Sequence, residues 1–130
     1  MVLCRTLAFL PLLASVPALA QCGAGEVEVN IIVHTDTYGY ETYWQLVPGG
    51  NACGNGTIFA GGNPTMGCAS GGAQAQVQQG YGNNLQITEG PWCLTEGANY
   101  TIHSIDDWGD GMAGFEVIVD GVSSEFFEQS

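Results

Sequence analysis

The stretch EVEVNIIVH, residues 26–34, alternates polar and apolar side chains over most of its length. Successive side chains of a β-strand point to opposite faces of its sheet, so one face of this segment would be apolar and the other would carry Glu26, Glu28 and Asn30. The apolar face is made of Val27, Val29, Ile31 and Val33. No later stretch shows sustained helical periodicity, so this pattern predicts an all-β fold.

The rest of the chain repeats the pattern in short pieces separated by Gly, Asn and Pro. Residues 42–47 alternate again with Trp44 and Leu46 on one face, which predicts that Trp44 is a core residue. The other predicted strands are residues 57–60, 73–79, 84–88, 92–95, 99–105, 114–120 and 122–128. We therefore expect a β-sandwich or jelly roll of about eight short strands, formed by one domain over residues 21–130.

Residues 1–20 have the features of a secretory signal peptide. Arg5 supplies the positive start, residues 7–19 are largely apolar, and residues 18–20 (ALA) match a cleavage site. The apolar run is short and contains two prolines, which argues against a transmembrane helix. We expect residues 1–20 to be removed and the remainder to be secreted without membrane insertion.

The charge of the chain is strongly one-sided. It contains 13 Asp and Glu residues, and its one basic residue, Arg5, lies in the expected signal peptide. Residues 21–130 therefore carry a net charge near −13 with neutral histidines. Nucleic acid and anionic membrane surfaces are excluded as partners, because both are bound through Lys and Arg. Two explanations of the acidity remain open: solubility in a salty extracellular medium, or a requirement for a divalent cation.

The cysteine count agrees with export. Cys4 lies in the expected signal peptide, so Cys22, Cys53, Cys68 and Cys93 remain. Four cysteines in a small secreted domain indicate two disulfides with three possible connectivities. We favour Cys53–Cys68, which would close a Gly-rich loop, and Cys22–Cys93, which would tie the N-terminus to the body. A zinc site is disfavoured, because no pair has the C-x₂-C spacing.

Residues 106–112 (DDWGDGM) place three carboxylates and two glycines between two predicted strands. A second acidic loop follows the strand at residues 26–34. Both loops would emerge at one edge if the preceding strands lie side by side and parallel, or face each other across the sandwich. We expect a Ca²⁺ site there, since this ion prefers several converging oxygens. The alternative is that the Asp side chains only cap tight turns. The candidate ligands are Asp36, Glu41, Asp106, Asp107 and Asp110.

Three aromatic residues in these loops are candidates for ligand binding. Exposed rings beside carboxylates are typical of sugar-binding surfaces, and we select Tyr38, Tyr40 and Trp108. His34 and His103 are expected to be hydrogen-bonded structural residues. No catalytic residues are predicted, because the chain lacks G-x-S-x-G and H-E-x-x-H motifs and has no Lys or Arg after residue 20 to stabilise a developing anion.

Several motifs resemble a recurrent secreted β-sandwich module of extracellular adhesins and other secreted proteins of marine bacteria and algae. They are T-D-x-Y-G-x-E-T-x-W-x-L over residues 35–46, Y-T-I over 100–102 and D-D-W-G-D-G over 106–111. The resemblance implies a non-catalytic role in attachment or ligand binding. The chain departs from the module at residues 112–114 (MAG), where the module often carries cysteines. It is also distantly similar to CUB-type domains in Cys22-Gly23, its four cysteines and its acidic edge.

The sequence thus predicts a secreted, calcium-stabilised, non-catalytic β-sandwich. Its partner would be an extracellular glycan or surface component. One alternative is a structural subunit of an extracellular fibre or matrix, which would act through self-association. A second alternative is a small secreted hydrolase, although no motif supports it.

Overall fold

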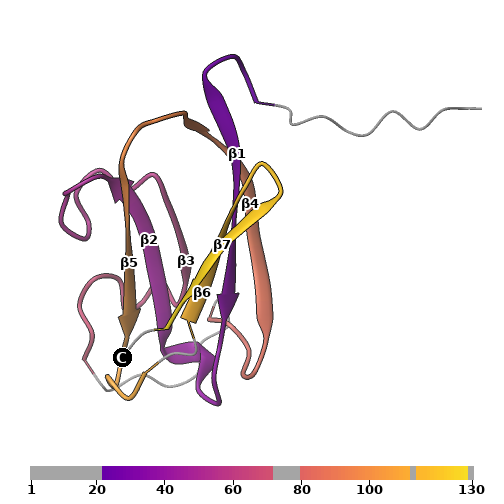
Figure 1. The fold of residues 1–130 in the computed structure, drawn as a ribbon. Helices are drawn as coiled ribbons and strands as arrows, with labels where there is room; N and C mark the ends of the chain where they lie inside the picture. The colour runs from indigo at the N-terminus through magenta and orange to yellow at the C-terminus, as the bar shows by residue number, and fades with distance from the viewer. Residues whose placement is uncertain (1–21, 72–79, 112–113, 129–130) are drawn as a thin grey trace, which may run out of the picture.

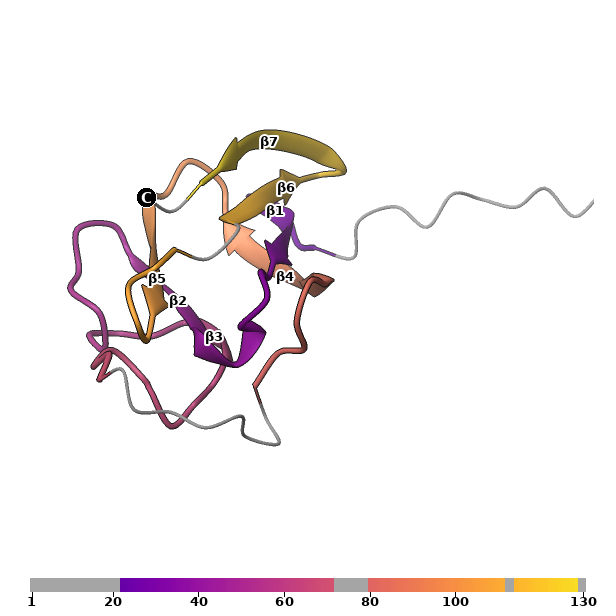
Figure 2. The ribbon, with the colours of Figure 1, turned by 90° about the horizontal axis from the view of Figure 1, so that it is seen from below.

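The computed structural model describes residues 22–71, 80–111 and 114–128. Within these ranges the chain forms seven strands, one 3₁₀ turn and two antiparallel sheets (Figure 1). Seen from below, the two sheets form two layers (Figure 2). The predicted all-β sandwich is therefore confirmed. The expected signal peptide and the strand predicted at residues 73–79 lie outside the described residues.

One sheet has four strands in the order β4-β1-β6-β7, and the other has three in the order β3-β2-β5. The strands are β1 (Glu26–His34), β2 (Thr42–Pro48), β3 (Phe59–Gly62), β4 (Gln86–Thr95), β5 (Tyr100–Asp106), β6 (Gly114–Val119) and β7 (Val122–Phe127). The 3₁₀ turn, η1 (Gly39–Glu41), lies between β1 and β2.

The core lies between β1 and β2, as the alternation of residues 26–34 predicts. Val29, Ile31 and Val33 are buried against Trp44 and Leu46 of the opposite sheet. Trp44 is 2% exposed, and its indole Nε1 donates a hydrogen bond of 2.8 Å to the Tyr81 hydroxyl. Trp44 is thus the core residue that its place in β2 predicts.

The two strands predicted at residues 84–88 and 92–95 are a single strand, β4, so that prediction was wrong. Gly90 and Pro91 look like a strand break in the sequence. In the structure the β1–β4 register shifts between Val29 and Ile31, opposite these two residues. A bulge of this kind accommodates Pro91, which has no backbone N–H to donate to the neighbouring strand, and β4 therefore continues beyond it. The strand predicted at residues 57–60 is displaced to Phe59–Gly62.

Both favoured disulfides are confirmed. Cys22–Cys93 ties the N-terminal segment to β4, and Cys53–Cys68 closes the Gly-rich loop around β3. Gln45 organises this loop from the sheet, because its buried Oε1 accepts hydrogen bonds of 2.7 Å from the Gly54 amide and the Thr57 hydroxyl. None of the described residues forms a helix long and apolar enough to cross a membrane.

The topology brings the two acidic loops to one end of the sandwich. β1 and β5 belong to opposite sheets, and both run downward in Figure 1. The loop after β1 and the loop after β5 therefore emerge together at the lower end. Of the two arrangements considered from the sequence, the structure has the one in which the strands face each other across the sandwich.

Candidate metal and ligand-binding site

The register of β2 and β5 positions the acidic residues at this end. Thr42, the first residue of β2, pairs with Asp106, the last residue of β5. One step further, the Asp107 amide donates a hydrogen bond of 3.0 Å to the Glu41 carbonyl oxygen. Glu41 ends η1 and therefore lies directly beside the start of the D-D-W-G-D-G loop.

Glu41, Asp106 and Asp110 converge. Each offers a carboxylate oxygen, and these atoms lie within 4.8 Å of one another. Glu41 is 6% exposed and Asp106 is 9% exposed, whereas Asp110 is exposed to solvent. Since the chain has no Lys or Arg after Arg5, no basic side chain of the described residues can neutralise this group, which we call the acidic cluster. Carboxylates this close repel one another unless a cation is present.

Asp106 also shapes its own loop. Its Oδ1 accepts hydrogen bonds of 3.1 Å from the amides of Trp108 and Gly109, and its Oδ2 accepts one from the Gly111 amide. Gly109 and Gly111 have positive φ angles of 72° and 99°, which glycine adopts without strain. The turn-capping role that the sequence offers as the alternative is therefore present at Asp106. A carboxylate oxygen has further lone pairs, so capping and cation binding are compatible.

The environment of Glu41 is unfavourable to a negative charge. Burial raises the pKa of its carboxyl, and the negative charges of Asp110, Asp106 and Asp36 raise it further. A hydrogen bond from Tyr40 acts in the opposite direction, and the same bond to Glu41 is the main reason that the pKa of the Tyr40 hydroxyl is raised. A bound cation would relieve the unfavourable charge on Glu41.

Two of the five predicted ligands lie outside the acidic cluster. Asp107 is buried, and its Oδ1 accepts a hydrogen bond of 2.7 Å from the Gly71 amide. Asp107 follows the last residue of β5, and its carboxylate is not part of the group formed by Glu41, Asp106 and Asp110. Asp36 caps its own turn, with a bond of 2.7 Å from the Tyr38 amide to its Oδ1. It acts on Glu41 through its charge alone.

The donor set of the acidic cluster suits a hard cation. Three carboxylates supply only oxygen ligands, which Ca²⁺ prefers over the nitrogen and sulfur ligands typical of zinc. Glu41 and Asp110 have carboxylates available for coordination, and Asp106 would add a shared oxygen. Backbone carbonyls and water would complete a shell of six to eight oxygens.

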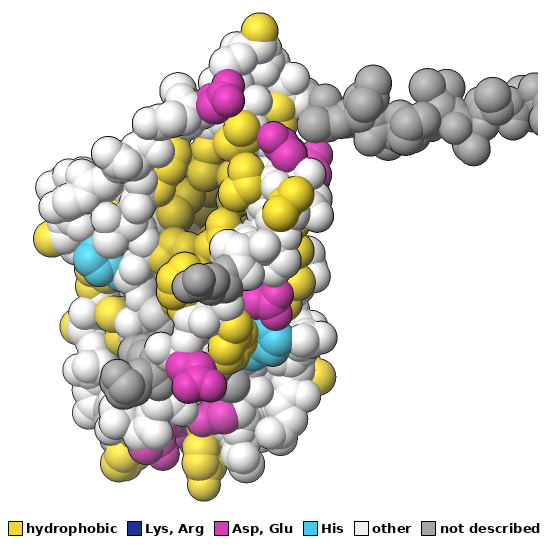
Figure 3. All heavy atoms as spheres, viewed as in Figure 1, with side chains coloured by type: hydrophobic (Ala, Val, Ile, Leu, Met, Phe, Trp, Pro, Cys, Tyr) yellow, Lys and Arg dark blue, Asp and Glu magenta, His cyan; other side chains and the backbone are white. Residues whose placement is uncertain are grey.

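The three predicted ligand-binding rings occupy the loops that carry the acidic cluster. Tyr38 is 46% exposed and Trp108 is 58% exposed. The ring of Tyr40 is perpendicular to that of Tyr38, with centroids 6.3 Å apart. In Figure 3, hydrophobic side chains protrude beside acidic ones at the lower end of the molecule. This end therefore combines exposed rings with carboxylates.

Sequence reasoning missed two asparagines that brace the site. The side-chain Oδ1 of Asn83 accepts a hydrogen bond of 3.0 Å from the Gly39 amide, and Asn63 donates one of 2.9 Å to the Tyr40 carbonyl oxygen. Both come from segments remote in sequence. The segment that contains Asn83 packs closely against Gly39, because a Cβ atom on Gly39 would lie 2.0 Å from the Gly82 carbonyl oxygen. Nothing in the sequence around these asparagines indicates this role.

The histidines are held by other partners. His34 Nε2 lies 2.9 Å from Glu116 Oε1, and His103 Nε2 lies 2.8 Å from the Asn51 carbonyl oxygen. Ser123 donates a hydrogen bond of 3.0 Å to the other Glu116 oxygen. Glu116 thus lies between Ser123 and His34 and is hydrogen-bonded to both.

No protein-family model matches the chain, and neither the curated proteins nor the solved structures yielded a significant match. The functional argument therefore depends on the geometry of the site.

Proposed function

We propose that this protein is a secreted, non-catalytic β-sandwich module that attaches to an extracellular glycan or surface component, and that Ca²⁺ stabilises its binding end. One observation carries the proposal. Glu41, Asp106 and Asp110 converge beside exposed rings in a chain that has no Lys or Arg after residue 5. A calcium ion would supply the missing positive charge.

Calcium would act by joining two loops. Glu41 ends the connection between β1 and β2, whereas Asp106 and Asp110 belong to the loop after β5. An ion shared by these side chains would fix the two loops relative to each other. Tyr38 and Trp108 lie in the same two loops, so the ion would also set the spacing of the exposed rings. Preorganised rings lose less entropy when they bind.

The chemistry of the rings suits a sugar. An exposed indole or phenol can stack on the apolar face of a pyranose, and neighbouring carboxylates can accept hydrogen bonds from its hydroxyls. The net charge near −13 opposes binding of acidic polysaccharides unless calcium bridges them. We therefore expect neutral glycans to bind directly and acidic glycans to require calcium.

Secretion is supported by the two disulfides, which persist in oxidising compartments. Extracellular fluids also commonly contain calcium at the millimolar concentrations that weak modules require.

The test is a glycan array and a polysaccharide pull-down, each performed in Ca²⁺ and in EDTA. Trp108→Ala should remove binding without changing the melting temperature, because its ring is largely in solvent. Val122→Ala is the control, since this apolar side chain is 71% exposed and lies on β7. Equal binding by both variants, or no retention on any glycan, would refute the glycan part of the proposal.

The fibre-subunit alternative has one supporting observation. Val122, Phe126 and Phe127 are exposed on β7, which is one of the two edge strands of its sheet in the described part of the chain. Exposed apolar edge strands favour association between chains. Light scattering in EDTA and in Ca²⁺ tests it, and a monomer in both would exclude it. A glycosidase and esterase screen tests the hydrolase alternative.

A further inference from the structure

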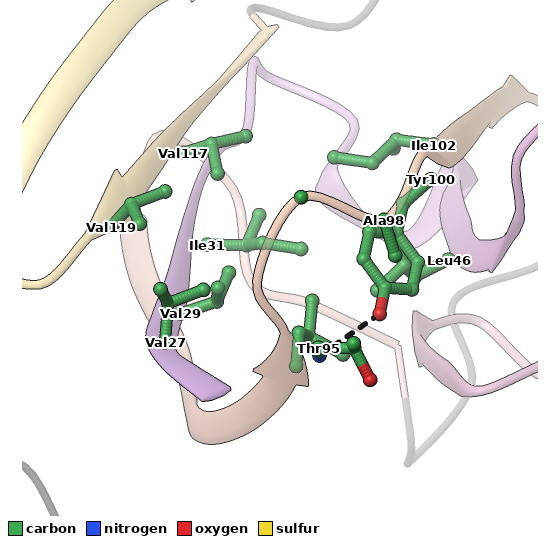
Figure 4. Close-up of a pocket in the computed structure, with 12 residues that line it drawn as sticks. Val27, Val29, Ile31, Leu46, Thr95, Ala98, Tyr100, Ile102, Val117 and Val119 are labelled. Atoms are coloured by element: carbon green, nitrogen blue, oxygen red, sulfur yellow. Dashed lines mark hydrogen bonds between the residues drawn. The ribbon is translucent and has the colours of Figure 1, made fainter. Parts of the chain in front are cut away.

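A second surface lies away from the acidic cluster. A cavity of about 260 Å³ opens between the two sheets, on the side bounded by β5 and β6. In Figure 3 it is the yellow hollow in the upper half of the molecule. Figure 4 shows side chains of one sheet facing those of the other across it. Its main apolar walls are Val29, Ile31, Val117 and Val119 on one side and Tyr100 and Ile102 on the other. We call it the groove.

The groove is a gap in the packing between the two sheets. Lower in the sandwich, Trp44 and Phe115 close the space between the sheets, and the remaining void there has no room for water. An apolar cavity of about 150 Å³ is already enough to hold benzene. The groove is larger and also opens to solvent, so part of the apolar surface of its walls is not covered by other side chains. Apolar surface of this kind commonly marks an interaction site.

The free edge of β5 lies along the groove. β5 pairs with β2 on one side, and no described strand pairs with it on the other. Tyr100 and Ile102 line the groove, while His103, between Ile102 and Ser104, reaches the Asn51 carbonyl oxygen in the loop after β2. A strand added beside β5 would continue this alternation and direct every second side chain into the groove. An extended segment with apolar side chains could therefore both pair with the free edge of β5 and fill the groove.

Charge restricts which strand can add. Glu96 and Asp120 lie in turns, each directly after a residue that lines the groove, and acidic side chains lie on both sides of the hollow in Figure 3. With no Lys or Arg after residue 5, the surroundings favour a basic segment. A second copy of this chain is disfavoured, because each copy carries a net charge near −13.

We propose that β5 and the groove bind an extended segment of a partner protein by β-strand addition. The segment has apolar residues at every second position, which enter the groove, and it is basic overall, so the acidic groups around the groove attract it. This site is separate from the calcium and glycan end, and it does not depend on the function proposed above.

The probe is a labelled, end-capped peptide of about nine residues in which Lys and Val alternate. We expect saturable binding together with slower hydrogen exchange at the amides of β5. Three control peptides separate the contributions. One groups the lysines and valines in blocks, one replaces Lys by Glu, and one carries N-methyl groups that remove alternate amide donors. All three should bind at least tenfold more weakly.

Two matched variants locate the site. Ala98→Trp fills the groove from its exposed wall and should weaken peptide binding at least tenfold. Ala60→Trp places the same ring on β3, at the opposite edge of the same sheet, and should leave binding unchanged. If Ala98→Trp does not fold, Val119→Arg provides the second test, because it adds a positive charge at a half-exposed position of the wall.

Three results would overturn the proposal. One is equal binding by the N-methylated peptide, because side chains alone would then account for affinity. Another is loss of binding in Ala60→Trp but not in Ala98→Trp, which would place the peptide on β3. The third is occupancy of the groove by dodecylamine but not by the alternating peptide, which would identify a site for a small amphiphile.

Discussion

Calcium should raise the thermal stability of this protein, and Asp110→Asn should abolish the effect. Asp110 is the best position to test. It belongs to the acidic cluster but is exposed, and no hydrogen bond of its side chain contributes to the loop geometry described above. Asn has nearly the same shape and lacks the charge, so the substitution removes a ligand without disturbing the Asp106 turn.

The expected size follows from linkage and from the cluster geometry. An ion at a hundredfold excess over its Kd stabilises the native state by about 2.7 kcal/mol. For a domain of this size, about 4 °C per kcal/mol gives a rise of about 10 °C. Two carboxylates 4.8 Å apart repel by about 0.9 kcal/mol even in water. In EDTA the variant should therefore melt up to about 4 °C higher than the wild type, because it loses two such repulsions and physiological salt screens each of them to roughly half.

The assay is differential scanning calorimetry of both proteins in EDTA and in millimolar Ca²⁺. The order of the melting temperatures should reverse: the variant is the more stable in EDTA and the less stable in calcium. Glu96→Gln is the control, since it removes one exposed charge in the turn between β4 and β5 and should keep the full calcium effect. An identical calcium shift in the wild type and Asp110→Asn would show that this cluster is not the site. No shift in the wild type would leave the carboxylates as turn caps.

Three further predictions concern stability, and chemical denaturation measures them all. Asp106→Ala should cost about 2 kcal/mol or more even in EDTA, because three loop amides lose a charged acceptor; an unchanged midpoint would contradict that role. Because the pKa of Glu41 is raised, the native state binds the proton of this carboxyl more readily than the unfolded chain does. The contribution of Glu41 to stability without metal is therefore fully present below its unfolded pKa, and it is lost as the pH rises through its folded pKa. Glu41→Gln should remove that part of the pH dependence, and an unchanged profile would contradict it. Loop entropy predicts that losing Cys22–Cys93, with a separation of 71 residues, costs about 4.4 kcal/mol, against about 3 kcal/mol for Cys53–Cys68, with a separation of 15; the reverse order would refute this estimate.

The fold was predictable wherever local alternation decides it. Val29, Ile31 and Val33 are buried because period-two alternation fixes which face of β1 meets the core. The break expected at Gly90 and Pro91 was wrong, because pairing with β1 outweighs local turn preference. The bulge opposite Gly90 and Pro91 cannot be predicted from the sequence of β4, because it depends on the pairing with β1.

The sequence predicted which two loops form the candidate site, but not which of their acidic residues converge. The sequence indicated two acidic loops, and the structure shows that they meet. It could not separate Asp106 from Asp107, because the choice depends on which side of β5 faces Glu41. Asn63 and Asn83 brace the site from segments that only tertiary folding brings near. The groove depends on how the sheets diverge, which no local pattern encodes.

The acidic cluster and the groove share β5 but should act independently. Tyr100 lines the groove and Asp106 belongs to the cluster, at opposite ends of the strand. Ile102 is the groove residue of β5 nearest to Asp106, and four residues at about 3.3 Å each separate them by about 13 Å. That distance exceeds the Debye length of about 8 Å at physiological salt, so a calcium ion changes the potential at the groove very little. Coupling would therefore have to pass through movement of β5, which is paired with β2 along its whole length and held at one end by the Asp106 turn. A strand constrained in this way has little freedom to shift, so calcium and a basic peptide should each bind with the same affinity whether or not the other is present.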